Sequence, residues 1–102
     1  MRKDKFISRI KSSLLQIDEG AVIILYGSRA RGDNKSDSDW DILILTDLPE
    51  SSRTRELFRD KIFDMELELE EPISTIIHNK TVWTEYEVTP FYQLISKEGK
   101  RI

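Results

Sequence analysis

Apolar residues recur at helical spacing near the start of the chain. This spacing predicts an amphipathic helix, with lysine and arginine side chains placed largely between the apolar ones. The basic flank is typical of a solvated face, although it could also meet an anionic partner. Gly20 follows Asp18 and Glu19, and we expect it to cap the end of the helix. The apolar positions are Phe6, Ile7, Ile10, Leu14 and Ile17.

The next pattern is a pair of continuous apolar runs separated by a short polar segment. Residues 21–26 read AVIILY, and a second run ends at Leu45. Runs of this kind, with β-branched residues, predict strands that are covered on both faces. The second strand is expected to begin at about Asp39. Between the strands, residues 29–31 are compatible with one helical turn and residues 33–38 form a polar loop.

Three further elements are predicted downstream. Over residues 53–70, apolar side chains repeat at intervals of four, three and four, which indicates a second long helix. Residues 65–69 also alternate strictly, as a strand would, so the end of this helix is ambiguous. Residues 73–77 follow a proline and are rich in β-branched side chains, which predicts a third strand. A final short helix is expected between a capping Thr89, which precedes a proline, and Gly99.

The predicted order is helix, strand, strand, helix, strand and helix. It favours an α/β (α+β) fold, in which helices pack on a small mixed β-sheet. At 102 residues the chain is expected to form one domain, residues 1–102, around a single core. Three aromatic residues near the last elements could stack on a base or meet a partner, but core or rim packing is the commoner role. They are Trp83, Tyr86 and Tyr92.

Composition narrows the chemistry. Apolar residues make up 38% of the chain and charged residues 34%, and the net charge is −3, which describes a soluble globular protein rather than a general polyanion binder. A nucleic-acid substrate is therefore unsupported. No apolar run approaches the ~20 residues of a membrane span and no signal peptide is apparent, which predicts a cytoplasmic protein without a membrane partner. The chain has no cysteine and a single histidine, His78, so any metal is expected to have oxygen ligands, as Mg²⁺ or Mn²⁺ prefers.

Candidate chemistry is concentrated around the polar segment between the first two strands. Gly27 lets the backbone approach a ligand closely, and Ser28 offers a hydroxyl and an N–H at the start of the following turn. These groups suit phosphate. Asp39 and Asp41 are two residues apart, so the period of a strand sends both side chains to one face. Their mutual repulsion is the kind that a bound divalent cation relieves.

Two common phosphate motifs are excluded. A P-loop would need a Gly-Lys-Ser/Thr after its glycines, and a dinucleotide fold would need three glycines at the first βα turn. The chain instead has Gly27-Ser28, ten intervening residues, and Asp39-x-Asp41 at the start of an apolar strand. This combination resembles the signature of the polymerase-β-like nucleotidyltransferases. The string GSRARGDNKSDSDWDILI resembles their smallest branch, the minimal nucleotidyltransferases (MNT), and VTPFYQLISKEG, residues 88–99, is similar to the family's C-terminal helix.

The resemblance implies a polymerase-β-like palm fold and specific residue roles. Gly27 and Ser28 would hold the β- and γ-phosphates of a nucleoside triphosphate. Asp39 and Asp41 would be the catalytic carboxylates that hold Mg²⁺ (or Mn²⁺) while a hydroxyl attacks the α-phosphate and pyrophosphate leaves. Arg31, and in second place Arg29, would contact phosphate; a solvated loop arginine is the alternative. Asp37 is expected to cap the loop rather than join the site.

The resemblance also exposes a departure, because the family usually carries a third acidic residue on a later strand, where it completes the metal site and acts as a base. The third predicted strand contains no carboxylate. Glu70 or Glu71 would have to reach the site, or Ser74 stands at the matching place. The identities of the base and of the third metal ligand therefore stay open. A weakened or partner-dependent activity is also compatible with this departure. The acidic residues before the strand are otherwise typical of a solvated helix flank.

Proteins of this branch commonly act as antitoxins that inactivate a helical HEPN-type toxin by transferring AMP to it. The resemblance therefore implies a Mg²⁺-dependent protein adenylyltransferase that takes ATP, or another nucleoside triphosphate, and modifies a hydroxyl of a HEPN-type partner. Two alternatives remain: a binding module that masks its partner by contact with a degenerate nucleotide site, and a transferase acting on a small molecule. The sequence is also compatible with a homo-oligomer.

Overall fold

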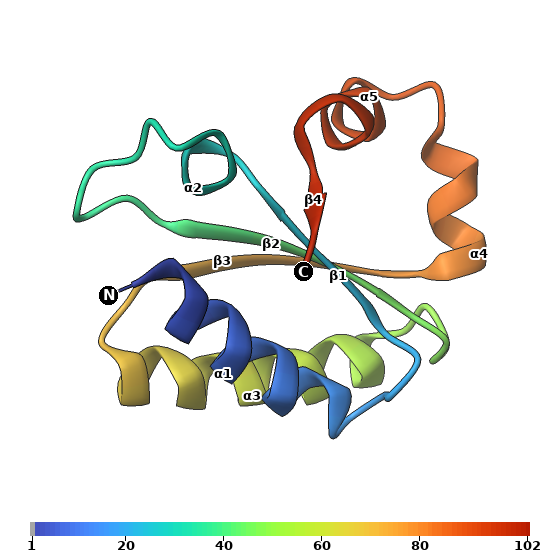
Figure 1. Cartoon of the computed structure of the whole chain (residues 1–102). Helices are drawn as coiled ribbons and strands as arrows, with labels where there is room; N and C mark the ends of the chain where they lie inside the picture. Colours follow the sequence, from blue (N-terminus) through green and yellow to red (C-terminus); the bar gives the residue numbers. More distant parts are fainter. Residues whose placement is uncertain (1) are drawn as a thin grey trace.

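The computed structural model describes residues 2–102 and contains one four-stranded mixed sheet (Figure 1). The strand order is β3-β2-β1-β4, so β3 and β4 are the two edges. The α/β fold with a small mixed sheet is confirmed. The strands are β1 (Val22–Tyr26), β2 (Trp40–Thr46), β3 (Ile73–Asn79) and β4 (Lys100–Arg101).

Strand register brings the chemistry-bearing segments to one end of the sheet. β1 is antiparallel to β2 and β4, whereas β2 and β3 are parallel. Tyr26, at the end of β1, lies opposite Asp41 near the start of β2. Asp41 in turn lies opposite Ser74 near the start of β3. The residues that follow β1 therefore meet the first residues of β2 and β3.

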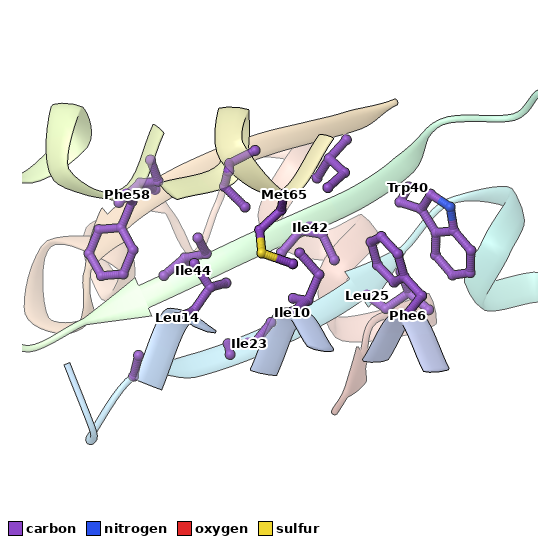
Figure 2. Close-up of a cluster of buried hydrophobic side chains, with 14 of the residues drawn as sticks. Phe6, Ile10, Leu14, Ile23, Leu25, Trp40, Ile42, Ile44, Phe58 and Met65 are labelled. Carbon is purple, nitrogen blue, oxygen red and sulfur yellow. The ribbon is translucent and has the colours of Figure 1, made fainter. Parts of the chain in front are cut away.

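Two helices, α1 (Lys3–Leu15) and α3 (Ser52–Leu69), cover one face of the sheet (Figure 1). Their apolar stripes enclose the main core with the inward side chains of β1 and β2 (Figure 2). The rings of Phe6 and Trp40 stack with their centroids 3.8 Å apart. Met65 is buried in this core. The alternation over residues 65–69 is thus part of a helix and not a strand, because it belongs to the stripe that begins earlier in α3.

The opposite face carries the short elements. The single helical turn predicted after β1 is α2 (Ser28–Arg31), and the predicted last helix is α5 (Pro90–Glu98). The Thr89 hydroxyl caps α5 by accepting the Tyr92 N–H at 3.2 Å, as the sequence predicts. A second, smaller cluster of buried residues fills this side, composed of Tyr26, Leu43, Leu45, Trp83 and Ile95.

Three elements were not predicted: α4 (Lys80–Trp83), the 3₁₀ helix η1 (Thr84–Tyr86) and β4. The expected packing of the aromatic residues is confirmed. Trp83 is buried and stacks on Tyr92 at 4.9 Å between ring centroids, while Tyr86 lies at the rim beside His78. Among residues 2–102, no helix is both long and apolar enough to cross a membrane.

The predicted cap at Gly20 is wrong. Helix α1 ends at Leu15 with Gln16 as its C-terminal cap, and Gly20 comes after a further turn. A side chain at Gly20 would collide with the carboxylate of Asp47. Gly20 thus lies where the chain entering β1 passes close to the Asp47 side chain that follows β2.

Candidate functional site

The turn between β1 and α2 brings the backbone against β2. Gly27 has φ 73° and ψ −159°, a conformation that favours glycine. A Cβ atom at this position would also collide with the carboxylate of Asp41. Helix α2 starts directly afterwards at Ser28 and ends at Arg31, with Gly32 as its C-terminal cap at φ 86°. The Gly27-Ser28 pair therefore turns the chain tightly and places its backbone beside a carboxylate.

The two arginines of α2 face different surroundings. Arg29 is buried, with 7% of its side chain exposed. Its guanidinium lies 4.3 Å from the Trp40 ring centroid and donates to the carbonyl oxygens of Ser36 at 3.2 Å and Ser38 at 2.9 Å. These contacts fix the loop that leads into Asp39. Arg29 is thus an anchor of the fold, and the weaker expectation that it contacts phosphate does not fit its burial.

Arg31 points the other way and remains half exposed, at 47%. Its Nε atom donates to Asp33 at 3.1 Å, and its Nη1 atom donates to both carboxylate oxygens of Glu98, at 3.2 and 3.1 Å. Its pKa is raised, first by the hydrogen bond to Asp33 and then by that to Glu98. Arg31 is therefore a permanent positive charge at the end of α2, and its role as a phosphate contact stays a prediction.

The predicted carboxylate pair lies at the start of β2. Asp39 precedes the strand by one residue and is exposed, whereas Asp41 is within the strand and partly buried. Because Trp40 enters the core against α1, Asp41 faces the side of the sheet that carries α2. Burial raises the pKa of Asp41, and the negative charge of Asp39 raises it further, while Arg31 opposes them. The two carboxylates thus repel each other, as the sequence predicts.

Asp37 does not join this pair. It is exposed in the turn that precedes β2. The expected capping of the loop is performed instead by Ser38, whose hydroxyl accepts the Lys35 N–H at 2.9 Å. The short hydroxyl of Ser38 reaches back to the start of the turn, and the Lys35 carbonyl accepts the Ser38 N–H at 3.2 Å.

Glu98 is the residue that sequence reasoning missed. It ends α5, and its side chain is only 16% exposed. Its Oε1 atom accepts the backbone N–H of Gly27 at 3.1 Å, in addition to the contacts with Arg31. Its charge also contributes to the raised pKa of Asp41. The glycine after Glu98 marks a helix end in the sequence, but no local signal shows that this helix end lies beside Gly27.

The β3 residue beside Asp41 carries a hydroxyl and not a carboxylate. Ser74 is the β3 residue in register with Asp41 and is exposed. Glu71 is nearly buried and accepts from Trp40 Nε1 at 3.3 Å, with Arg29 at 3.8 Å. Glu70 caps α3 in a left-handed conformation, with φ 54°, and is exposed. Across residues 2–102, no group of three or more histidine or acidic side chains is arranged to hold a metal ion.

The donor atoms present still fit a hard divalent cation. Mg²⁺ is commonly held by one or two carboxylates together with phosphate oxygens and water. Asp39 and Asp41 supply two carboxylates; burial is the main cause of the raised pKa of Asp41, and repulsion by the negative charge of Asp39 adds to it. A cation at this point would offset that repulsion. The chain can therefore offer part of a metal site that a phosphate ligand would complete.

A surface hollow elsewhere on the molecule is not part of this arrangement. It has a volume of about 430 Å³ and lies against α3 and β3. Its walls combine Phe63, Ile73 and Thr75 with charged side chains of α3. None of the predicted site residues lines it. The hollow contains neither the Asp39 and Asp41 pair nor the turn at Gly27, so it lies apart from the candidate site.

Comparisons with known proteins agree with the fold. The profile of a family described as nucleotidyltransferase domain matches residues 7–101. No curated protein sequence matches the chain. A crystal structure of a toxin–antitoxin with AMP-PNP is similar with a TM-score of 0.63 at 19% identity, over 98% of this chain and 72% of that one. A mutant of the toxin–antitoxin MntA–HpeT is similar with a TM-score of 0.60 at 20% identity, over 100% and 72%.

Proposed function

Because the chain belongs to the nucleotidyltransferase domain family, we propose that it transfers a nucleoside monophosphate, AMP from ATP, to a hydroxyl acceptor. One observation carries this proposal. The backbone N–H of Gly27 and the guanidinium of Arg31 converge on a single carboxylate, that of Glu98, so they form a group that binds an anion. The carboxylates that suit a cation lie beside this group. Such a pairing suits a metal-bound triphosphate.

Each residue of the site then has a role that follows from its chemistry. The Gly27 N–H, the Ser28 hydroxyl and N–H, and the Arg31 guanidinium would bind the β- and γ-phosphates. Asp39 and Asp41 would hold Mg²⁺ (or Mn²⁺). When bound, the ion offsets the negative charge of the phosphates and of the leaving pyrophosphate. The acceptor oxygen forms a bond to the α-phosphorus and releases its proton to water. The bond between the α-phosphorus and the oxygen that bridges to the β-phosphate breaks, so that pyrophosphate leaves.

The proposed acceptor is a hydroxyl of a HEPN-type toxin, which makes this chain the antitoxin of a pair. The two structural neighbours support this choice, because both are toxin–antitoxin structures. One of them was crystallised with AMP-PNP, which supports ATP as the nucleotide donor. The MNT signature in residues 27–44 supports the same assignment.

The test is a transfer assay with α-labelled ATP, Mg²⁺ and the HEPN-type toxin proposed as the partner. We expect label on that partner, and none with Asp41→Asn. The matched control is Asp64→Asn, which removes the same charge from an exposed position of α3 and should label like the parent. An unlabelled partner, or equal labelling by Asp41→Asn, would contradict the proposal.

A second function is favoured by the hydroxyl at Ser74, since this position pairs with Asp41 and carries no carboxylate. In this function the chain masks the toxin by contact, with a degenerate nucleotide site. Asp39→Asn separates the two in cells that express the toxin. Neutralisation that persists in this variant supports masking, whereas restored toxicity supports transfer.

A further inference from the structure

The carboxylate of Glu98 occupies the groups that the proposed function assigns to phosphate. It accepts the Gly27 N–H at 3.1 Å and is held by Arg31 Nη1 through both of its oxygens. A backbone N–H has one hydrogen and makes one good hydrogen bond at a time. A triphosphate oxygen and Glu98 therefore compete for Gly27, and two anions also repel each other across Arg31.

The fold holds Glu98 in this position from two sides. Strand β4 pairs with β1, with Leu25 opposite Lys100, and two further steps along this register bring Glu98 level with Gly27. Gly99, between the helix and the strand, permits the close packing, because a side chain there would crowd the Ile95 carbonyl and the Ile24 side chain. The contact between Glu98 and Gly27 is thus built by the C-terminal segment and is not a chance surface pair.

We propose that Glu98 is an internal anion that occupies the phosphate groups of the nucleotide-free protein and is displaced by the incoming triphosphate. The C-terminal helix α5 thereby sets the affinity of the site for nucleotide. This inference rests on the proposed function. Nucleotide binding must break the Glu98 contacts with Gly27 and Arg31. The free energy needed to displace this side chain lowers the affinity for nucleotide.

The variant that tests the competition is Glu98→Gln. The glutamine amide oxygen can still accept the Gly27 N–H, but the negative charge that holds Arg31 and repels phosphate is gone. Calorimetric titration with AMP-PNP and Mg²⁺ should give binding about two- to fivefold tighter than that of the parent, the scale of one partly exposed ion pair. The matched control, Glu85→Gln, removes the same charge from the exposed surface of η1 and should bind like the parent.

The outcomes separate this inference from the proposed function. If the parent binds AMP-PNP and Glu98→Gln binds it equally or more weakly, Glu98 has only a structural role. That result would contradict the competition between Glu98 and phosphate but not the nucleotide site itself. If neither protein binds AMP-PNP, the proposed function fails and the inference fails with it. A gain in Glu85→Gln of equal size would also overturn it, because the effect would be one of net charge.

A second measurement decides the matter should Glu98→Gln not fold. It is a crystal structure of the parent protein with AMP-PNP and Mg²⁺. We expect a phosphate oxygen on the Gly27 N–H and the Glu98 carboxylate moved away from it. A complex in which Glu98 keeps its contacts with both Gly27 and Arg31 would overturn the inference.

Discussion

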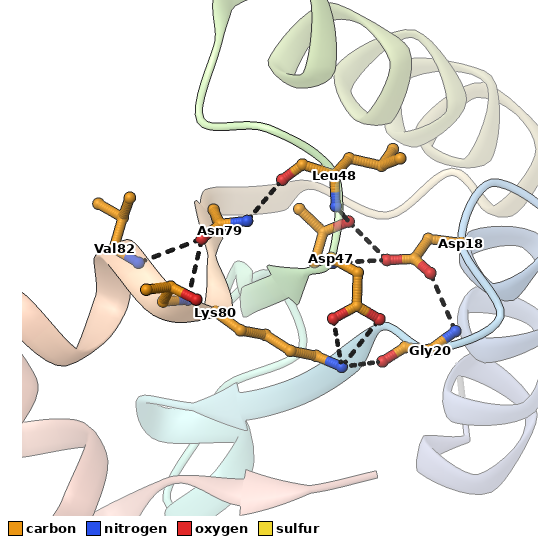
Figure 3. Close-up of polar contacts among 9 residues, drawn as sticks. Asp18, Gly20, Asp47, Leu48, Asn79, Lys80 and Val82 are labelled. Atoms are coloured by element: carbon orange, nitrogen blue, oxygen red, sulfur yellow. Dashed lines mark hydrogen bonds and ion pairs between the residues drawn. The ribbon is translucent and has the colours of Figure 1, made fainter.

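The two ends of the β1–β2 ladder hold their carboxylates in opposite ways. At one end, Asp18 accepts hydrogen bonds from the Thr46 hydroxyl at 2.6 Å, the Asp47 N–H at 2.9 Å and the Gly20 N–H at 3.0 Å (Figure 3). Lys80 completes this end, because its ammonium group reaches the Gly20 carbonyl at 2.6 Å and Asp47 at 3.1 Å. Each negative charge there has donors.

At the other end, the carboxylates of Asp39 and Asp41 lie close together, and Arg31 is the cation that acts on Asp41. Burial opposes ionisation of both Asp18 and Asp41, but the neighbours differ. For Asp18, the hydrogen bonds outweigh burial and lower the pKa. For Asp41, burial and then the charge of Asp39 raise the pKa, with only Arg31 acting against them. The ionised Asp18 carboxylate therefore stabilises the fold. The ionised Asp41 carboxylate destabilises it, and a bound cation would offset this effect.

The largest effect is expected from Asp41→Asn. Transfer to the partner should fall by at least about 100-fold, since the variant removes a charge placed for the reaction. The melting temperature should rise by about 2 °C, because an ionised, partly buried carboxylate beside Asp39 is removed. Labelling rates and calorimetry, with Asp64→Asn as the control, check both signs. A lower melting temperature would show that Asp41 stabilises the fold. It would contradict the difference drawn between Asp18 and Asp41 at the two ends of the β1–β2 ladder.

Arg29→Met should cost about 2 to 3 kcal/mol of unfolding free energy, because it removes a buried guanidinium and leaves two loop carbonyls without their donor. Arg31→Met, at a half-exposed position, should cost clearly less, because solvent screens its ion pairs. Urea unfolding of the two variants compares the costs. Equal losses of unfolding free energy would contradict the assignment of Arg29 as a structural anchor and Arg31 as a ligand contact.

Asp18→Asn should destabilise the protein by about 1 to 2 kcal/mol at neutral pH, because its hydrogen bonds lose their charge. The pKa of Asp18 is lowered in the fold, so its contribution is present above the unfolded pKa of about 3.9 and is lost as the pH falls through the folded pKa. Urea unfolding from neutral pH to about pH 3 checks this window. The gap between parent and variant should narrow on acidification, and a constant gap would contradict the account.

Ser74→Asp should have the smallest effect and would sharpen the comparison. It adds a third carboxylate next to Asp41, so without metal the melting temperature should fall by about 2 °C. Titration with Mg²⁺ should recover more stability than it does in the parent. Ser52→Asp, at an exposed position of α3, controls for the added charge. Equal recovery in both variants would show that position 74 does not face the cation site.

Much of the fold is predictable from local patterns. The strand at 21–26, the turn at Gly27 and the period of Asp39 and Asp41 depend on residues close in sequence. The length of β3 and the presence of α4 and β4 are not, because they depend on packing that short windows do not contain. Gly20 illustrates the limit: it lies against the Asp47 side chain, and a sequence window shows only a helix that must end nearby.

The site divides in the same manner. The glycine turn and the carboxylates are visible as a motif, whereas the register of Ser74 with Asp41 is seen only in the sheet. The separate roles of Arg29 and Arg31 are not visible, because both lie in one helical turn and only the tertiary fold decides which is buried. Glu98 lies 71 residues from Gly27, and its position depends on the pairing of β4 with β1.

The most direct test of the central claim is thermal unfolding with Mg²⁺ and AMP-PNP. At about ten times Kd, linkage gives ~1.4 kcal/mol, which corresponds to a rise of roughly 6 to 10 °C for a domain of this size. We predict this rise for the parent only when both Mg²⁺ and AMP-PNP are present, and its loss in Asp41→Asn. A parent that gains nothing, or an Asp41→Asn variant that gains equally, would contradict the claim that the carboxylates at this end await a metal-bound nucleotide.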